Sequence, residues 1–285
     1  MRSRDADMYH MRTPIAPVAI TRVENGSVSA ADDILVTEEP LEIRLGHGPL
    51  DDRREFRLSV TMRTPGNDEE LAFGFLFTEG IIDQAAQVVR VISCENVKDE
   101  ERGNVVRAEL RPDVEVDAAR WQRNFYTTSS CGVCGKSSIQ AVHAQCTRPL
   151  PKPPAMDHAL ITSLPDRMHA GQTVFKYTGG IHAAALFNGQ GELLILREDV
   201  GRHNAVDKVI GALVGSTAPV DDKILLVSGR AGFELVQKCV MAGIPAMVAV
   251  GAPSSLAVQL ARAHGLLLVG FLRGERFNIY SGQLP

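Results

Sequence analysis

The feature that most constrains the fold is a regular alternation of short apolar runs and amphipathic segments in the second half of the chain. The runs have the length of buried strands, and the segments between them repeat apolar residues at helical spacing. The predicted strands are Ile224–Val227, Ala246–Val250 and Leu266–Phe271, and the predicted helices are Phe233–Met241 and Leu256–His264. Strands separated by helices pair in parallel and are covered on both faces. This half therefore predicts a three-layer α/β/α domain.

Two further elements precede that alternation. Residues 181–187 and 192–196 flank Asn188–Gly191, a favourable hairpin turn, and a helix is expected from about Arg202. The first half predicts an α+β arrangement instead: a helix capped by Asn67 or Asp68 and ended by Gly80, with strands within 17–45, 56–62, 88–93 and 104–110. We therefore divide the chain into a flexible tail (1–13), an α+β subdomain (14–126) and an α/β/α domain (127–285).

The composition limits the classes of partner and compartment. Net charge is −4, so non-specific binding to nucleic acid or to an anionic membrane is not expected. No apolar run is long enough to span a bilayer, and Met1–Pro14 lacks the apolar core of a secretory signal. The chain has 5 cysteines, an odd number that does not suit a disulfide scaffold. We expect a cytoplasmic protein with reduced thiols, in which Cys94, Cys146 and Cys239 are incidental.

Cys131 and Cys134 lie in a small, hydroxyl-rich segment flanked by glycines. The glycines let the backbone turn so that both sulfurs can point the same way, and Lys136 favours a thiolate. The pair can be a redox dithiol, a persulfide carrier, half of a metal site or two incidental thiols. A zinc site needs two more ligands, for which His143 and Cys146 are the downstream candidates. Without a second tight pair, zinc is the weaker interpretation, and we expect no permanent metal.

Polar, glycine-rich loops follow several predicted strands. In the loop 198–204, the free amides at the start of the next helix and Arg202 would attract an anion, and His203 is expected to pair with Asp207 one turn later. The loop 228–232 repeats this geometry with Arg230, and 252–255 adds hydroxyls. Loops at the carboxyl ends of strands meet at one edge of a sheet, where ligands bind. These loops predict a pocket for an anionic ligand.

Two other motifs also have ordinary explanations. Gly179 and Gly180 before His182 allow close approach of a ligand, but taken alone this motif is better explained by a simple turn with a core histidine. Arg273 and Arg276 flank Gly274 and suit bidentate contacts with phosphate or guanine, but a solvated charged turn fits equally.

Taken together, these motifs resemble the FdhD family of formate dehydrogenase accessory sulfurtransferases. The resemblance covers nearly the whole chain after the tail and rests on segments in one order: 68–76 with 79–81, 130–136, 178–184, 198–211, 228–230 and 271–276. It implies a cytidine-deaminase-like α/β/α domain with a smaller α+β subdomain. Zinc deamination itself is excluded, because no histidine is followed two residues later by glutamate and Ser130 stands where deaminases have proline.

The resemblance also implies an activity. Cys131 would carry a persulfide received from a cysteine desulfurase, with Cys134 as its partner. The sulfur would pass to the bis-guanine-dinucleotide molybdenum cofactor, bound as substrate, for formate dehydrogenase. GDP would bind the same place as an analogue, and the protein would be a homodimer. Zinc binding, or cofactor chaperoning without sulfur chemistry, remain the alternatives.

The residues expected to contact the cofactor come from the resemblance and from the polar loops. They are Phe271, Leu272, Arg273, Gly274, Glu275, Arg276, Gly179, Gly180, His182, Asp199, Arg202, His203, Ser228 and Arg230.

Overall fold

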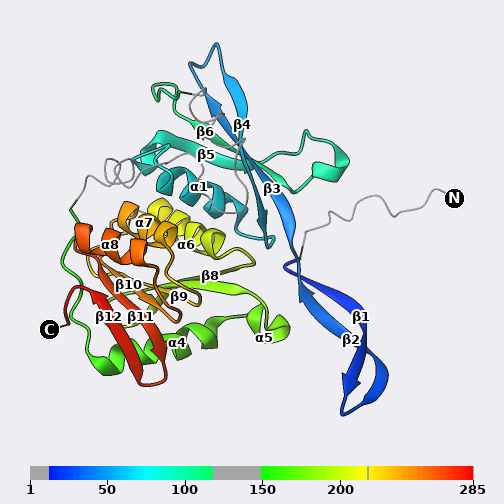
Figure 1. Ribbon diagram of the computed structural model, residues 1–285. Helices are drawn as coiled ribbons and strands as arrows, with labels where there is room; N and C mark the ends of the chain where they lie inside the picture. Colours follow the sequence, from blue (N-terminus) through cyan, green and yellow to red (C-terminus); the bar gives the residue numbers. More distant parts are fainter. Residues whose placement is uncertain (1–12, 118–148, 217, 285) are drawn as a thin grey trace.

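The computed structural model describes residues 13–117, 149–216 and 218–284 of the chain. These residues form a mixed α/β structure with three separate sheets, of six, four and two strands. Figure 1 shows the six-stranded sheet with its helices in the lower body, the four-stranded sheet above it and the two-stranded sheet to one side.

The six-stranded sheet has the order β12-β11-β10-β9-β7-β8. Its centre is parallel, because β9, β10 and β11 run in one direction, while β7 lies antiparallel to both β8 and β9. The strands are β7 His182–Phe187, β8 Leu193–Asp199, β9 Ile224–Val227, β10 Ala246–Ala249, β11 Leu267–Arg273 and β12 Arg276–Ser281. The predicted parallel strands and the predicted hairpin are confirmed.

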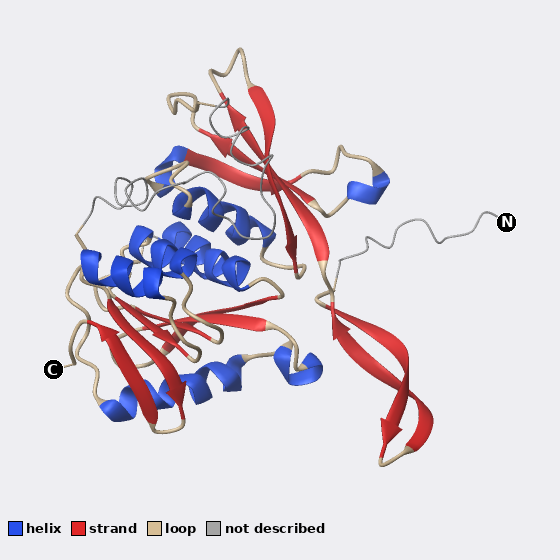
Figure 2. Cartoon of the chain, viewed as in Figure 1, coloured by secondary structure: helices blue, strands red, loops and turns tan. Residues whose placement is uncertain are grey.

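Helices cover both faces of this sheet (Figure 2). Alternate strand residues face opposite sides, so Leu225 and Val227 of β9 pack with α6, α7 and α8, whereas Ile224 and Leu226 pack with α4. The helices are α4 His158–Gly171, α6 Arg202–Ser216, α7 Phe233–Met241 and α8 Ser255–His264. The predicted helix–sheet–helix order is therefore observed, while the likeness to cytidine deaminase stays a prediction.

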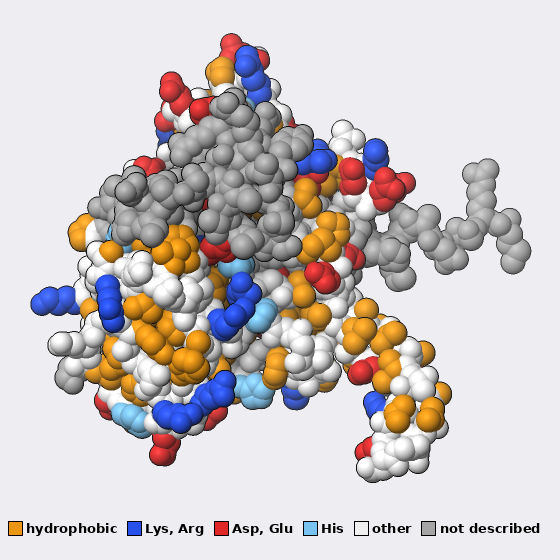
Figure 3. Space-filling model, viewed as in Figure 1, with side chains coloured by type: hydrophobic (Ala, Val, Ile, Leu, Met, Phe, Trp, Pro, Cys, Tyr) orange, Lys and Arg blue, Asp and Glu red, His pale blue; other side chains and the backbone are white. Residues whose placement is uncertain are grey.

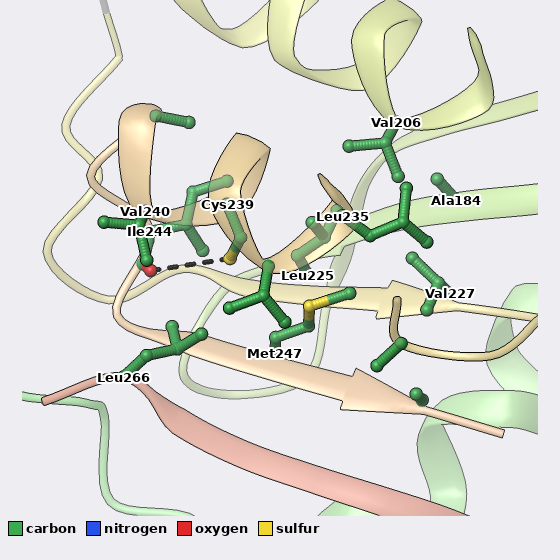
Figure 4. Packing of buried hydrophobic residues seen from close by; sticks show 14 of the residues in the cluster. Ala184, Val206, Leu225, Val227, Leu235, Cys239, Val240, Ile244, Met247 and Leu266 are labelled. Carbon is green, nitrogen blue, oxygen red and sulfur yellow. Dashed lines mark hydrogen bonds between the residues drawn. The ribbon is translucent and has the colours of Figure 1, made fainter. Parts of the chain in front are cut away.

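Cys239 belongs to the core on the α7 side of the sheet (Figure 4). Its Sγ lies 3.6 Å from the carbonyl oxygen of Ile244, and burial raises the pKa of the thiol. A buried thiol with a raised pKa is a poor nucleophile. Its expected role as an incidental core residue fits this environment.

The four-stranded sheet has the order β4-β3-β6-β5, and α1 covers one of its faces. Its elements are β3 Glu39–His47, β4 Arg54–Arg63, α1 Asp68–Thr78, β5 Val88–Ser93 and β6 Val105–Leu110. The other side of α1 packs on α6 at a crossing where Gly74 meets Asp207 and Gly211 meets Glu70. A Cβ at either glycine would overlap the facing backbone carbonyl, so glycine permits this crossing.

The two-stranded sheet forms an arm that extends away from the body (Figure 1). It consists of β1 Ile15–Glu24 and β2 Ser27–Val36, paired antiparallel along their whole length. Strands were predicted here, but their separation from the four-stranded sheet was not. Three short helices complete the described chain: 3-10 turns at Ala85–Gln87 and Asp99–Glu101, and α5 at Phe175–Thr178.

Two local predictions need correction. The residues after Phe271 were expected to form a turn beyond the last strand, but Arg276–Ser281 is a further strand, β12, that returns along β11. At the start of α1, Asn67 is in the left-handed region and its side chain caps nothing. Asp68 instead accepts two hydrogen bonds from buried Arg63, of 2.9 and 2.8 Å.

Candidate functional site

The candidate residues separate into a described group and a group outside the described residues. Cys131 and Cys134, together with His143 and Cys146, lie between residues 118 and 148, outside the described residues. The other candidates lie at the edge of the six-stranded sheet where β8, β9, β10 and β11 end, or next to it.

Three loops at this edge are joined by their backbones. The amide of Gly251 donates to the carbonyl of Gly229 at 2.9 Å, and the amide of Phe271 donates to the carbonyl of Gly251 at 3.1 Å. A Cβ on Gly251 would lie 2.9 Å from the backbone of Arg230, so this close stacking depends on glycine. The loops after β9 and β10 and the end of β11 therefore form one continuous surface, as the sequence predicted.

His182 and Ser228 meet at the same edge, because the start of β7 lies beside the end of β9. The Ser228 hydroxyl accepts from the amide of Ala183 at 3.0 Å. The His182 ring lies next to Gly229. A Cβ added to this glycine would lie 3.5 Å from His182 Nδ1, which is an ordinary contact distance. Burial lowers the pKa of His182, and the positive charges of Arg202 and His203 lower it further. His182 is thus held toward its neutral form.

A cavity of about 420 Å³ opens between α4 and this edge. Its lining combines an aromatic ring, histidines, an amide, a carboxylate and a hydroxyl: Pro165, Asp166, Met168, His169, Gln172, Phe175, Ile181, His182 and Ser228. Two of the predicted residues, His182 and Ser228, belong to it. Its α4 side was missed, because the sequence of that helix carries no motif.

The predicted pair of His203 and Asp207 is wrong. His203 Nε2 lies 2.6 Å from Glu234 Oε2, so the imidazole contacts the start of α7. Asp207 also contacts α7, one turn further along, where it accepts from Lys238 Nζ at 2.9 and 3.0 Å, and it accepts from Thr78 of α1 at 2.8 Å. The prediction relied on the four-residue spacing of the two side chains on one helix, but each of them instead contacts residues of other helices.

Asp199 was expected to contact the ligand, and its surroundings point to a structural role. The side chain is fully buried, and its carboxylate contacts Lys208 Nζ at 2.7 Å and accepts from Asn204 Nδ2 at 3.0 Å. It also accepts from the backbone amides of Thr64 and Gly201. A carboxylate with these partners holds the loop 199–204 against the four-stranded sheet.

The glycine pair lies after α5, near the cavity. Gly179 has φ of 63° and ends α5, a conformation that favours glycine. A Cβ on Gly179 would meet nothing within 4 Å, and one on Gly180 would meet only a carbonyl at 3.6 Å. The space above this backbone is therefore open to a ligand.

The segment 271–276 is the tip of the hairpin between β11 and β12. Phe271 has φ of 54° at a β-bulge and is 41% exposed. Leu272, a predicted contact, is 2% exposed and packs in the core beneath α4, so it supports the tip from inside. His158 Nε2 donates to the carbonyl of Glu275 at 2.7 Å and ties the tip to the start of α4. His158 was not predicted.

Positive charge gathers over this edge. Figure 3 shows Lys or Arg and His side chains on the front of the molecule, over the strand ends and the hairpin tip. Within the described residues, no ion pair involves Arg202, Arg230, Arg273 or Arg276. Unpaired guanidinium groups beside open backbone suit an anionic ligand with several phosphates.

The described residues contain neither a metal-binding cluster nor a membrane-spanning helix. They contain no cluster of three or more His, Cys, Asp or Glu side chains that could hold a metal ion. None of the helices they form has the length and apolar character needed to cross a bilayer.

The chain is similar to known proteins over most of its length. The sequence model of the FdhD/NarQ family matches residues 36–284. A protein of Streptomyces avermitilis named sulfur carrier protein FdhD is 51% identical over 269 residues, 93% of each chain. Proteins of the same name are 49% identical in Mycobacterium tuberculosis, over 87% of this chain and 90% of that one, and 42% identical in Sulfurisphaera tokodaii, over 93% and 96%.

A solved structure shares the fold. The crystal structure of a putative formate dehydrogenase accessory protein from Desulfotalea psychrophila superposes with a TM-score of 0.72. It is 24% identical, and the superposition covers 94% of this chain and 97% of that one.

Proposed function

The chain belongs to the FdhD/NarQ family, and from that premise we propose that it is a sulfur carrier that serves formate dehydrogenase. In detail, Cys131 accepts a sulfane sulfur from a cysteine desulfurase and the protein acts as a sulfurtransferase. The acceptor is the bis-guanine-dinucleotide molybdenum cofactor, bound as substrate. The cytoplasmic location and the homodimer are parts of this proposal.

The sulfur chemistry uses the thiol pair, the donor persulfide and an external dithiol that reduces the pair after each transfer. The Cys131 thiolate attacks the terminal sulfur of the donor, the donor S–S bond breaks, and the donor cysteine leaves as a thiolate. The Cys134 thiolate then attacks Sγ of Cys131, forms a disulfide and releases the outer sulfur as hydrosulfide to the molybdenum cofactor. An external dithiol reductant returns the pair to thiols.

The observation that carries the cofactor half of the proposal is the unpaired positive charge at the sheet edge. Arg202, Arg230, Arg273 and Arg276 make no ion pair within the described residues, and they come from the loops and the hairpin tip at this edge. A guanine dinucleotide brings phosphates that guanidinium groups bind in bidentate fashion. GDP should therefore bind here as a fragment of the substrate.

The sulfur half is tested by intact-protein mass spectrometry after incubation with a cysteine desulfurase and cysteine. Wild type should gain one sulfur atom that a reductant removes, and Cys131→Ala should gain none. Cys94→Ala is the matched control and should behave as wild type, because burial raises the pKa of the Cys94 thiol. No added sulfur with an active desulfurase would favour a cofactor chaperone, and stoichiometric zinc lost on Cys131→Ser would favour a metal-binding module.

The cofactor half is tested by GDP titration. Arg273→Ala and Arg276→Ala should each weaken GDP binding by about tenfold or more, as expected for loss of a charge-assisted hydrogen bond. Arg54→Ala is the control, since this exposed arginine pairs with Asp52 on the four-stranded sheet. Unchanged affinity in both hairpin variants would place the nucleotide elsewhere.

A further inference from the structure

Glu198 at the end of β8 is surrounded by backbone amides from a neighbouring segment. Its Oε2 accepts from the amides of Thr173 at 2.9 Å and Val174 at 2.8 Å. Its Oε1 accepts from the amide of Phe175 at 2.9 Å and from Nε2 of Gln172 at 3.2 Å. Three successive N–H groups that converge on one anion form an anion-binding nest, which the chain here fills with its own carboxylate.

The segment held in this way forms one wall of the cavity. Gln172, Phe175, Ile181 and His182 all line it. The segment has little structure of its own, since α5 has only 4 residues and Gly179 and Gly180 follow it. A helix of this length is not stable in isolation, so its position depends on contacts outside it. Glu198 supplies such a contact by joining the start of α5 to the sheet.

We propose that Glu198 is a positioning residue that holds the wall 172–182 in its ligand-binding position. Its carboxylate fixes the backbone at Phe175, which lines the cavity together with His182. The ligand class is an anionic molecule with a planar heteroaromatic ring, of which GDP is the probe. The inference rests on the proposed function for that ligand, but the anchoring itself depends only on the contacts of Glu198.

A neutral side chain removes this anchor. In Glu198→Gln the side chain keeps its shape, but one of the two acceptor oxygens becomes an NH2 group, a donor that cannot accept from the backbone N–H it faces, and the remaining oxygen carries no charge. The wall then samples other positions, and the apparent affinity falls by the fraction of time spent in the competent one. Glu198→Asp keeps the charge on a side chain one methylene shorter and should restore part of the affinity.

The test combines amide hydrogen exchange with GDP titration. In Glu198→Gln the amides of residues 173–175 should exchange faster while β7 and β9 stay protected, and GDP affinity should fall about tenfold. Glu198→Asp should lie between this variant and wild type. Glu192→Gln is the matched control, because this glutamate beside the other end of β8 contacts Asn188 in the hairpin turn. It should leave both readouts unchanged.

Each outcome decides between the inference and the proposed function. Faster exchange at 173–175 with unchanged GDP affinity would overturn the positioning role, and unchanged exchange would overturn the anchoring. Failure of wild type to bind GDP would overturn the cofactor half of the proposed function and the ligand assignment made here. Persulfide formation on Cys131 is independent of Glu198, so its loss in wild type would count against the sulfur half alone.

Discussion

At the interface of α1, α6 and α7 the charges are buried and paired, whereas Arg202, Arg230, Arg273 and Arg276, where the strands of the six-stranded sheet end, make no ion pair within the described residues. Lys238 and Asp207 are only 6% and 3% exposed in their side chains and lie 2.9 Å apart. Arg230, Arg273 and Arg276 are exposed. The glycines of the two regions also differ in the space around them. A Cβ on Gly74 or Gly211 would overlap the backbone of the facing helix, whereas a Cβ on Gly179 would meet nothing within 4 Å.

The two regions draw on one continuous sequence segment. In residues 198–211, Arg202 and His203 lie at the sheet edge, while Asp207, Lys208 and Gly211 face the four-stranded sheet and α1. The same residue types thus stay open to a ligand in one region and hold α6 against the four-stranded sheet and α1 in the other, according to their partners. The difference teaches that a polar, glycine-rich motif identifies the loop between a strand and the following helix. Burial then decides which residues of that motif can reach a ligand.

The largest effect is expected from Lys238→Met, which leaves the Asp207 carboxylate buried without its cation. Removing one partner of a buried pair costs about 3–5 kcal/mol of unfolding free energy. Although burial lowers the pKa of Lys238, attraction to Asp207 and Glu79 raises it above its ordinary value. The part of the stabilisation that comes from the charge of Lys238 is therefore complete at neutral pH and is lost as pH rises through that raised pKa.

Urea unfolding at pH 7 measures this effect, with Arg230→Met as the control from the sheet edge. The control should change the unfolding free energy by less than about 0.5 kcal/mol, as exposed substitutions do. Equal losses in the two variants would contradict the distinction between paired and unpaired charges.

A smaller loss is expected from Gly211→Ala, because the new methyl group would force α6 away from α1. Overpacking of this kind costs about 1–3 kcal/mol. Gly180→Ala is its counterpart at the sheet edge, where the Cβ would meet only a carbonyl at 3.6 Å. That variant should unfold within about 0.5 kcal/mol of wild type and should weaken GDP binding. Thermal unfolding and GDP titration of both variants measure these effects. Equal destabilisation by Gly211→Ala and Gly180→Ala would contradict the difference between the two glycines.

Much of the fold could be predicted because the apolar pattern of its strands and helices matches the faces that they bury in the structure. The strand Ile224–Val227 and the helix Phe233–Met241 have the predicted bounds. The strand β12 was missed because the bulge at Phe271 interrupts the alternation and Arg273 and Arg276 resemble a solvated turn. The separate arm was missed because sequence pattern shows strands but not which strands pair.

The site was predictable only at the level of its loops. The gathering of the loops at one edge follows from parallel strands and was confirmed. The burial of Asp199 depends on Thr64 and Lys208, and the partner of His203 is Glu234 on another helix. No spacing rule links such distant positions. For the same reason, the role of Glu198 as an acceptor for the wall of the cavity had no signal in the sequence.

The smallest effect concerns His182, which lies at the sheet edge but is half-buried like an interface residue. Burial lowers its pKa, the charges of Arg202 and His203 lower it further, and Asp199 opposes them. Because the unfolded chain then binds this proton more readily, stability falls as pH drops below the ordinary histidine value and stops falling below the folded pKa. The loss should be smaller than that caused by either substitution above.

Urea unfolding of wild type and His182→Gln at pH 7.5 and pH 5.5 isolates this contribution, since the other titrating groups are common to both. Wild type should lose more stability than the variant on acidification, and equal losses would show that another group is responsible. An anion at this edge offsets the charges of Arg202 and His203 and so raises the pKa of His182. GDP binding should therefore take up a proton in wild type and less in the variant, a linkage that a buried, paired charge such as Lys238 would not show.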